Sequence, residues 1–511
     1  MAGRRPIQQN GHDGAPAAPS LVRLARSAER IGWERYFFMS VGVLLFCAVY
    51  FYPSFSDAVG PKGERFLLTD QARGALALFL LAATWLIFEV VPIGVTSITI
   101  GVVQVLFQIR PARAAFGDFM DPSVWFIIGS ITFGMVFSKT GLTKRMAYGM
   151  LALVGERTSM IYLGSFIITL LLTLIMAHTT VAATIFPLLM AICGLYSEDD
   201  KPTQFGKGLF IGMAYVAGAG SIITLLGSAR AAVAIGFFKE MAGREVSFLE
   251  LPYYMLPIGC VMVALIWLLC MILFKPEKRT IPGLKERARM LYQRLGPVSR
   301  IEILSMVIIL SAIAMMGARS FLPILEPLDK TAIILAAAIL FFVLNILSLK
   351  DLEGIPWNIV LLFGGSMSMG FCLWETGATQ WLAIKCLAFF QAAPWFLFVM
   401  GVAFFILATT NLIINVAVIA LLLPVALVMA PYLGVAPEVI FFSCLVTAGM
   451  PFMLLVGAAP NAIAYESKQF SSRQFFLAGV PASMMAMAVL AFFVWLVWPL
   501  MGMPVVVQLT Q

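Results

Sequence analysis

Apolar runs of about 20 residues, separated by short polar segments, recur along the chain. A helix needs a run of that length to cross the hydrocarbon core of a bilayer. The clearest runs lie at 37–52, 75–91, 253–274, 301–316, 332–347 and 481–498. A membrane β-barrel would instead have shorter segments of alternating polarity. The pattern predicts an all-α polytopic membrane protein, and the 12% of charged residues, about half the share of a soluble protein, agrees with this.

Basic residues are concentrated in two polar segments, 1–36 and 275–300. By the positive-inside rule both lie in the cytoplasm, so the net charge of +8 indicates membrane orientation and no nucleic-acid partner. We therefore expect a disordered, cytoplasmic N-terminus, an external C-terminus and a bacterial-type inner membrane. The seven cysteines show no metal-type spacing and are interpreted as buried free thiols.

The two halves of the chain repeat the same motifs. Three glycines recur at an offset of 236 residues, namely Gly129/Gly365, Gly134/Gly370 and Gly141/Gly377. Pro187/Pro424 recur at 237 and Gly227/Gly457 at 230. Counting spans places the second repeat in the opposite orientation, and inverted repeats are typical of secondary transporters.

The spans and repeats together predict the domain plan. A disordered basic tail at 1–36 is followed by scaffold helices at 37–120 and by a first repeat core at 121–274, which contains a re-entrant hairpin at 159–194 and a broken helix at 207–237. A cytoplasmic basic loop at 275–300 leads to a second set of scaffold helices at 301–348. The second repeat core, at 349–511, contains a re-entrant hairpin at 394–430 and a broken helix at 436–463.

Each repeat carries two polar breaks within apolar sequence. One lies at the middle of the expected hairpin, "MAHTT" in the first half and "TTNLIINV" in the second; the other, "GSARA" or "GAAPN", interrupts a helix. Unpaired backbone groups are tolerated at membrane depth only beside a polar cavity or a ligand. Helix N-termini attract anions, so the four breaks predict one site for a small anionic substrate.

The sequence resembles the divalent anion:sodium symporters, the INDY-like dicarboxylate and citrate transporters, over nearly all of the chain after residue 37. The resemblance is carried by "FEVVPIGVTSI", "DPSVWFIIG", "IPWNIVLLFGG" and "GAAPNAIAYES". It implies about eleven transmembrane helices plus two re-entrant hairpins, a homodimer surrounded by membrane lipids, and an elevator movement of a transport domain. It also implies Ser-Asn-Thr at both hairpin tips, binding substrate carboxylates and Na⁺.

The signature motifs depart from the family pattern. Ser-Asn-Thr becomes Ala177–Thr179 in the first tip and Ile414–Val416 in the second, and the first Gly-Thr-Pro-Pro-Asn becomes Gly227–Ala231. By motif position, the substrate-binding candidates are His178, Thr179, Gly227, Ser228, Arg230, Asn415, Val416, Gly457, Ala458 and Pro460. The Na⁺ candidates are Thr173, Thr410, Asn415 and Gly457.

Two charged or titratable residues stand in these motifs, with two interpretations each. His178 is either a substrate donor or proton-coupling group, or a neutral histidine bonded to backbone. Arg230 is either a fixed cation that replaces Na⁺ and pairs with a substrate carboxylate, or an arginine paired elsewhere in the protein. A fixed Arg⁺ repels Na⁺, so we expect the first Na⁺ site to be lost and Na⁺ to remain possible at the second. Glu89 and Glu375 are interpreted as structural groups at span ends.

The leading functional hypothesis is a secondary transporter of small organic anions, working by an elevator mechanism with anion exchange or proton coupling. The alternatives are a Na⁺-coupled di- or tricarboxylate, sulfate or sulfonate symporter, and a transporter-derived receptor. No nucleophile–base set or cofactor motif indicates an enzyme. Because Ile414, Val416 and Ala458 lack hydroxyls, we expect an anion smaller or less symmetric than citrate.

Overall fold

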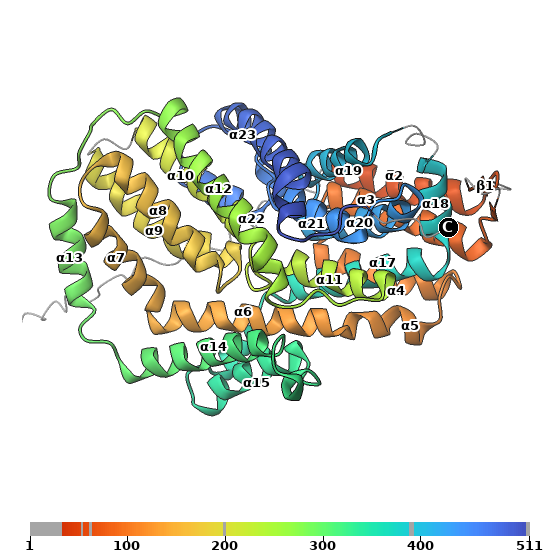
Figure 1. The fold of residues 1–511 in the computed structure, drawn as a ribbon, viewed down its shortest axis with the longest axis horizontal. Coiled ribbons are helices and arrows are strands. Elements are labelled where there is room, and N and C mark those ends of the chain that lie inside the picture. The colour runs from red at the N-terminus through yellow and green to blue at the C-terminus, as the bar shows by residue number, and fades with distance from the viewer. Residues whose placement is uncertain (1–32, 53–54, 61–63, 198–200, 388–392, 507–511) are drawn as a thin grey trace, which may run out of the picture.

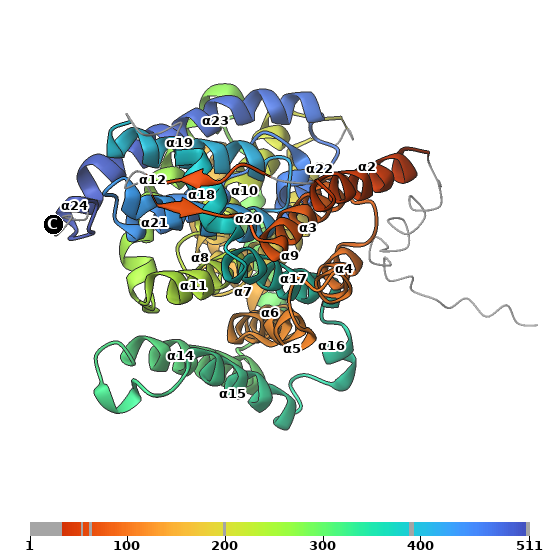
Figure 2. The ribbon, with the colours of Figure 1, turned by 90° about the vertical axis from the view of Figure 1, so that its right-hand side faces the viewer.

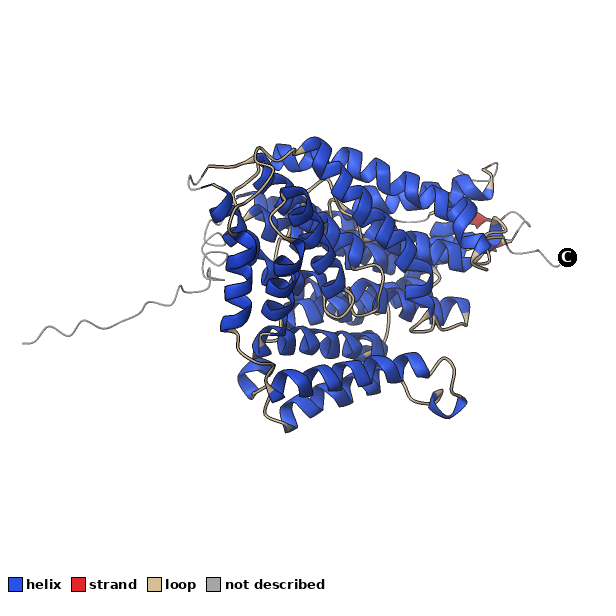
Figure 3. Ribbon diagram, turned by 60° about the vertical axis from the view of Figure 1, so that its left-hand side comes forward, coloured by secondary structure: helices blue, strands red, loops and turns tan. Residues whose placement is uncertain are grey.

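The computed structural model describes residues 33–506 except for 53–54, 61–63, 198–200 and 388–392. The expected tail at 1–36 therefore lies outside the described residues apart from its last four, which form the first turn of a helix. Figure 3 shows that nearly every described segment is helical. The exception is a two-stranded antiparallel sheet, β1 (Ala58–Val59) with β2 (Arg65–Phe66).

The helices of the first half extend to the end of the basic loop. They are α2 (Trp33–Tyr50), α3 (Asp70–Ile87), α4 (Ile93–Leu106), α5 (Ala112–Gly117), η1 (Asp118–Met120), α6 (Pro122–Thr140), α7 (Leu142–Val154), α8 (Thr158–Thr173), α9 (His178–Tyr196), α10 (Gln204–Gly220), α11 (Ala229–Ala242), α12 (Glu250–Leu273) and α13 (Leu284–Arg294).

The second half repeats most of this order. Its helices are α14 (Arg300–Ala318), η2 (Pro323–Leu325), α15 (Lys330–Val343), α16 (Leu349–Glu353), α17 (Trp357–Glu375), α18 (Ala378–Leu387), α19 (Trp395–Thr410), α20 (Asn415–Tyr432), α21 (Pro437–Ala448), η3 (Leu455–Gly457), α22 (Ala459–Tyr465), α23 (Ser472–Phe492), η4 (Phe493–Val497) and α24 (Trp498–Leu500).

The fold is that of an all-α polytopic membrane protein, as the apolar pattern predicts. Within the described residues, nine helical segments are long and apolar enough to cross a membrane, and five shorter apolar helices accompany them. Figure 1 shows α13, within the basic loop, lying across the ends of several of these helices. In Figures 1 and 2, α14 and α15 form an outer layer beside α6.

The polar breaks interrupt both repeats at matching places. Helices α8 and α9 are joined by residues 174–177, and α19 and α20 by residues 411–414, so each pair is a helical hairpin with a four-residue tip. Residues 221–228 separate α10 from α11, and residues 449–458 separate α21 from α22. The residues that precede the restarted helices share extended backbone angles, with φ −159° at Ser228 and −153° at Ala458.

The repeats pack on each other reciprocally through two glycines. A Cβ atom on Gly129 of α6 would lie 2.8 Å from the Ile334 side chain on α15, and one on Gly365 of α17 would lie 2.6 Å from Cβ of Ser97 on α4. Both contacts need a residue without a side chain, and the two contacts are related by the repeat offset. The two close helix pairs, α6 with α15 and α17 with α4, thus each join one helix of the first repeat to one helix of the second.

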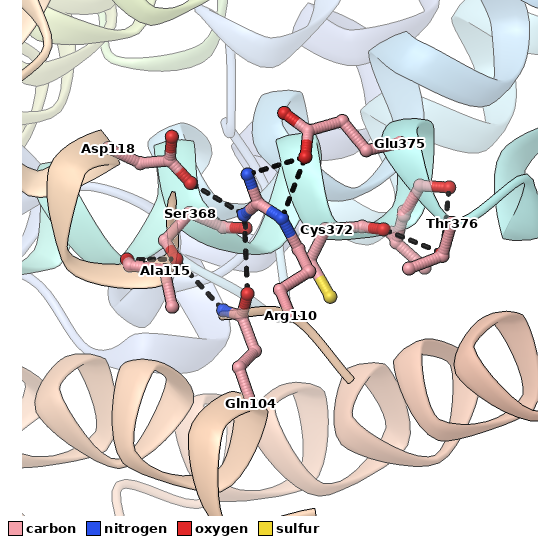
Figure 4. Close-up of polar contacts among 9 residues, drawn as sticks. Gln104, Arg110, Ala115, Asp118, Ser368, Cys372, Glu375 and Thr376 are labelled. Carbon is pink, nitrogen blue, oxygen red and sulfur yellow. Dashed lines mark hydrogen bonds and ion pairs between the residues drawn. The ribbon is translucent and has the colours of Figure 1, made fainter. Parts of the chain in front are cut away.

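A buried ion-pair cluster joins the α4–α5 connection to the end of α17 (Figure 4). The Arg110 guanidinium is 5% exposed and lies 2.7 Å from the Asp118 carboxylate and 2.8 Å from that of Glu375. It also donates to the Gln104 side chain, which in turn donates to the Ser368 hydroxyl. The interpretation of Glu375 as a salt-bridged residue at a span end is confirmed.

A more exposed ion pair occupies the repeat-related position. Lys139, which is 236 residues before Glu375, ends α6 and donates to the Asp351 carboxylate of α16 at 2.5 Å. Asp351 also accepts from the Ser348 hydroxyl and backbone N–H. These donors lower the pKa of Asp351 to about 2, so the pair is charged at neutral pH.

Candidate functional site

A cavity of about 380 Å³ lies where both hairpin tips and both helix breaks meet. The first tip contributes Ala177–Thr180 and the second Ile414–Val416, while the breaks contribute Ser228–Ala229 and Ala458–Ala459. The opposite wall comes from α4, α6, α17 and the segment before α17, with Ile93, Ile127, Ser130, Ile131, Met135, Gly354, Pro356, Ile359, Leu362 and Phe363.

Six of the ten residues predicted to bind substrate line this cavity. They are His178, Thr179, Ser228, Asn415, Val416 and Ala458. The other four, Gly227, Arg230, Gly457 and Pro460, are buried directly behind the cavity wall. The sequence motifs thus come together around one cavity. Some of their residues form its surface, and the others lie behind that surface and support it.

Four helices of the two repeat cores begin at the cavity: α9, α11, α20 and α22. The residues before α9 and α20 are Ala177 and Ile414, and neither side chain accepts a hydrogen bond from the first helical turn. The first backbone N–H groups of a helix have no intrahelical acceptor and carry the positive end of its dipole. This side of the cavity is therefore suited to an anion.

Arg230 holds the first break together from behind the wall. Its side chain is 1% exposed, and its two terminal nitrogens donate to the Ser228 and Ser221 hydroxyls, each at 2.8 Å. Within the described residues, no carboxylate lies within 4.0 Å of this guanidinium. A buried charge without a counterion is unfavourable, and an anion in the neighbouring cavity would compensate it.

The same guanidinium also reaches the second repeat. A Cβ atom on Gly449, at the end of α21, would lie 2.6 Å from a terminal nitrogen of Arg230. The preceding carbonyl, that of Ala448, accepts a hydrogen bond from the Thr410 hydroxyl at 3.2 Å. The positive charge of Arg230 therefore lies between the two regions in which the sequence predicts Na⁺ ligands.

His178 is anchored to the first break at two points. Its backbone N–H donates to the Gly227 carbonyl oxygen at 3.1 Å, and its side-chain Nδ1 lies 3.2 Å from the same oxygen. A carbonyl oxygen only accepts, so Nδ1 carries a hydrogen, and in the neutral ring Nε2 is then an acceptor. His178 can donate from Nε2 to an anion only as an imidazolium.

Neutral amides hold the second break where Arg230 holds the first. The Asn461 side chain donates to the carbonyl oxygens of Pro451 and Leu454 at 2.8 and 3.1 Å. The Asn411 side chain accepts from the backbone N–H groups of Met453 and Leu454 at 2.8 and 3.3 Å. The two repeats therefore fold alike but differ in charge.

The glycines of both breaks meet a hairpin carbonyl at close range. A Cβ atom on Gly227 would lie 2.6 Å from the Thr173 carbonyl oxygen, and one on Gly457 would lie 2.8 Å from that of Thr410. Two of the predicted substrate residues thus contact two of the predicted Na⁺ ligands. Only glycine permits this approach without a shift of backbone.

The oxygen atoms that could bind Na⁺ differ between the two regions in which the sequence predicts Na⁺ ligands. In both, the threonine hydroxyl donates to a backbone carbonyl, but in the first Ser228 also accepts from the Arg230 guanidinium, whose charge repels a cation. The residues of the first region do not fit Na⁺. In the second, Thr410, Asn415 and Gly457 offer neutral oxygens, and the first two side chains are buried. That set fits a hard cation in donor type.

The chain and fold match known membrane transporters. The profile described as the sodium:sulfate symporter transmembrane region matches residues 60–504. The sodium-dependent dicarboxylate transporter SdcS of Staphylococcus saprophyticus is 24% identical over 460 residues, which cover 86% of this chain and 88% of SdcS. A Staphylococcus aureus SdcS is also 24% identical, over 83% of this chain and 86% of its own length.

Two solved structures share the fold. The YdaH transporter of Alcanivorax borkumensis is 13% identical and superposes with a TM-score of 0.53, covering 92% of this chain and 98% of its own. MtrF of Neisseria gonorrhoeae, from a class of antimetabolite efflux pumps, is 12% identical with a TM-score of 0.57, covering 93% and 98%. At this identity the likeness concerns the fold alone.

Proposed function

Because the chain belongs to the sodium:sulfate symporter family of membrane transporters, we propose that it carries small organic anions across the bacterial plasma membrane with His178 and Arg230 in place of the first Na⁺. Each passage moves one anion together with one proton. Net transport is then driven by a proton gradient, and exchange of one anion for another needs no gradient.

The observation that carries this proposal is the charge of Arg230, which has no carboxylate partner among the described residues, beside a cavity at which α9, α11, α20 and α22 begin. A fixed cation and helix N-termini stabilise an anion without any bound metal ion. Two unit charges about 6 Å apart interact by on the order of 3 kcal/mol at an effective dielectric constant of about 20. An interaction of that size favours an anion and disfavours Na⁺ at the same place.

His178 supports proton coupling through its hydrogen-bond geometry. With Nδ1 bound to the Gly227 carbonyl, a lone pair on Nε2 is the group that a bound anion would meet. Burial and the nearby positive charge of Arg230 disfavour a proton on Nε2 while the cavity is empty, and the lining residues include no carboxylate that would offset them. A bound anion supplies the opposite charge, so we propose that the proton binds together with the anion.

The packing supports an elevator movement. Helix α6 packs on α15 and α17 packs on α4, so we propose that α6 and α17 belong to the scaffold although the sequence plan places them in the repeat cores. Their cavity-facing residues are mainly apolar, which suits a wall past which the hairpins and broken helices slide. We further propose that the scaffold forms a homodimer in the membrane.

A second candidate is Na⁺-coupled dicarboxylate symport. It is favoured by the similarity to SdcS, which is a sodium-dependent dicarboxylate transporter, and by the neutral oxygens of Thr410, Asn415 and Gly457. Sulfate and tricarboxylates fall under the same candidate, because the matching profile describes sodium:sulfate symporters.

Uptake into proteoliposomes that contain the full chain separates these candidates. Labelled succinate, sulfate and benzenesulfonate serve as probes, and external Na⁺, external pH and the internal anion are varied one at a time. We expect uptake of at least one probe that rises with an inward proton gradient or with internal anion and is unchanged by Na⁺. Uptake that requires Na⁺ and ignores both other variables would establish the second candidate instead.

A further inference from the structure

We propose that the substrate is an organic monoanion with an apolar body, a carboxylate or a sulfonate, bound in one fixed orientation. Its charged head lies at the first hairpin tip, and its body lies against the second tip and the scaffold wall. The inference rests on the proposed function, since it concerns the same cavity, and it differs from the dicarboxylate named for the relatives.

The cavity is polar on the side of one repeat and apolar on the side of the other. In the first repeat His178, Thr179 and Ser228 line it, and their counterparts at the repeat offsets of 237 and 230 are Asn415, Val416 and Ala458. Three polar side chains thus face one polar side chain and two apolar ones. On the second side an anion would find the Asn415 side chain and the first backbone N–H groups of α20, and hence fewer side-chain donors than on the first.

The neighbours of these residues strengthen the asymmetry. Thr180 lines the first side, whereas Ile414 and Val456 line the second, and Val456 is 64% exposed. A carboxylate at the second side would lose its hydration and find Asn415 as the one polar side chain among those of the second repeat that line the cavity. An unpaired charge is costly in such a place, whereas an apolar group is stabilised there.

The scaffold wall continues the apolar surface. Ile127, Ile131 and Met135 of α6 face the cavity together with Leu362 and Phe363 of α17. Ser130 also lines this wall, but its hydroxyl donates to the Leu226 carbonyl at 3.1 Å and is thereby occupied. The wall therefore offers contact area for a hydrocarbon body and little that would hold a second charge.

The cavity volume leaves room for this body. At about 30 Å³ for each non-hydrogen atom with its hydrogens, the volume that one water molecule occupies in the liquid, a cavity of about 380 Å³ holds at least a dozen such atoms. A carboxylate or sulfonate head uses three or four of them. The rest suffices for a short alkyl chain or one aromatic ring.

Thermal unfolding of the purified full chain with single anions tests the inference. Benzenesulfonate, hexanesulfonate and hexanoate are compared with succinate, citrate and sulfate at equal concentration and pH. We expect the first three to raise the melting temperature at concentrations at least tenfold lower than the others. Stronger stabilisation by succinate or citrate would overturn the inference.

Counterflow in proteoliposomes separates this result from the proposed function. Sulfonates remain ionised and do not leak through lipid as neutral acids, so labelled benzenesulfonate reports protein-mediated exchange. We expect at least tenfold stronger inhibition by hexanesulfonate than by succinate. Saturable exchange of succinate but not of benzenesulfonate would refute the monoanion alone, whereas no saturable exchange of any probe would refute the proposed function.

The double variant Val416→Thr with Ala458→Thr adds hydroxyls to the apolar side. We expect it to shift the preference at least tenfold toward succinate, because the second carboxylate then finds donors. Val307→Thr, on the exposed face of α14, is the matched control and should leave the preference unchanged. An unchanged preference in the double variant that still melts like the parent would contradict the proposed orientation.

Discussion

The Nδ1 atom of His178 lies 3.2 Å from the Gly227 carbonyl oxygen, so the imidazole is fixed to the helix break that forms part of the same cavity. This contact determines the tautomer of the neutral ring and turns an acceptor toward any bound anion. The histidine that interrupts an apolar run is therefore bonded to backbone, as one of the two interpretations of the sequence has it. Proton uptake by its Nε2 atom belongs to the proposed function.

Replacement of His178 by Gln is expected to remove the pH dependence of anion binding. If one proton is taken up with the anion, the apparent affinity of the parent rises up to about tenfold for each pH unit lowered while the empty site is unprotonated. Isothermal titration with benzenesulfonate between pH 6 and pH 8 measures this slope. His12→Gln, which changes the other histidine of the chain, is the control, and a slope that survives in His178→Gln would contradict the assignment.

Replacement of Arg230 by Gln is expected to weaken anion binding by about 100-fold. The amide keeps a donor near Ser221 and Ser228 but removes a charge whose interaction with the anion is on the order of 3 kcal/mol. Binding is measured by thermal shift in Na⁺-free buffer. Arg244→Gln, an exposed arginine paired with Glu250, is the control; equal losses in both variants would point to a general effect of charge.

Alanine at Gly227 or Gly457 is expected to abolish transport and to destabilise the fold by about 1–3 kcal/mol, as overpacking does. The new methyl group would meet the Thr173 or Thr410 carbonyl oxygen, which belongs to backbone and cannot turn aside. Melting temperature and exchange are measured together. Gly194→Ala is the control, because nothing lies within 4 Å of its Cβ position, and full activity in Gly227→Ala would contradict the predicted contact.

The two repeat-related ion pairs are expected to differ in strength. Arg110→Gln leaves the carboxylates of Asp118 and Glu375 without their cation and should cost about 3–5 kcal/mol, whereas Lys139→Gln at an exposed pair should cost about 1 kcal/mol or less. Thermal melting in detergent compares them. Equal losses of stability in the two variants would contradict the prediction that the more buried pair contributes more.

The Lys139–Asp351 pair also predicts a pH dependence. The pKa of Asp351 in the fold is about 2, below the 3.8 of an ordinary aspartate side chain. The pair therefore stabilises the fold above about pH 4, and this contribution is lost as the pH falls toward 2. The difference in melting temperature between the parent and Lys139→Gln should therefore be smaller at pH 3 than at pH 7. A difference that grows on acidification would contradict the lowered pKa.

The sequence could predict the fold because its signals are local and duplicated. Apolar runs define the helices, and the recurrence of Gly129 at Gly365 indicates the repeat. The structure places both glycines at reciprocal close contacts. The positions of the hairpin tips likewise follow from polar residues such as His178 and Asn415 within apolar sequence.

The hydrogen bonds and ion pairs that hold the site in place could not be predicted from the sequence in the same way. Ser221 and Asn411 act through partners later in the chain, Arg230 and Leu454, and neither contact follows from the local sequence pattern. Arg110 likewise gives no sign of its partners in the local sequence. Its role depends on Glu375, which lies 265 residues later in the chain.

The most direct test of the account is the number of protons that accompany each anion. Proteoliposomes that contain the full chain and an internal pH dye are exposed, in Na⁺-free buffer with equal pH on both sides, to an inward gradient of labelled benzenesulfonate. The account predicts internal acidification of one proton for each anion taken up, and its loss in His178→Gln. Anion uptake that requires Na⁺ and leaves internal pH unchanged would contradict it.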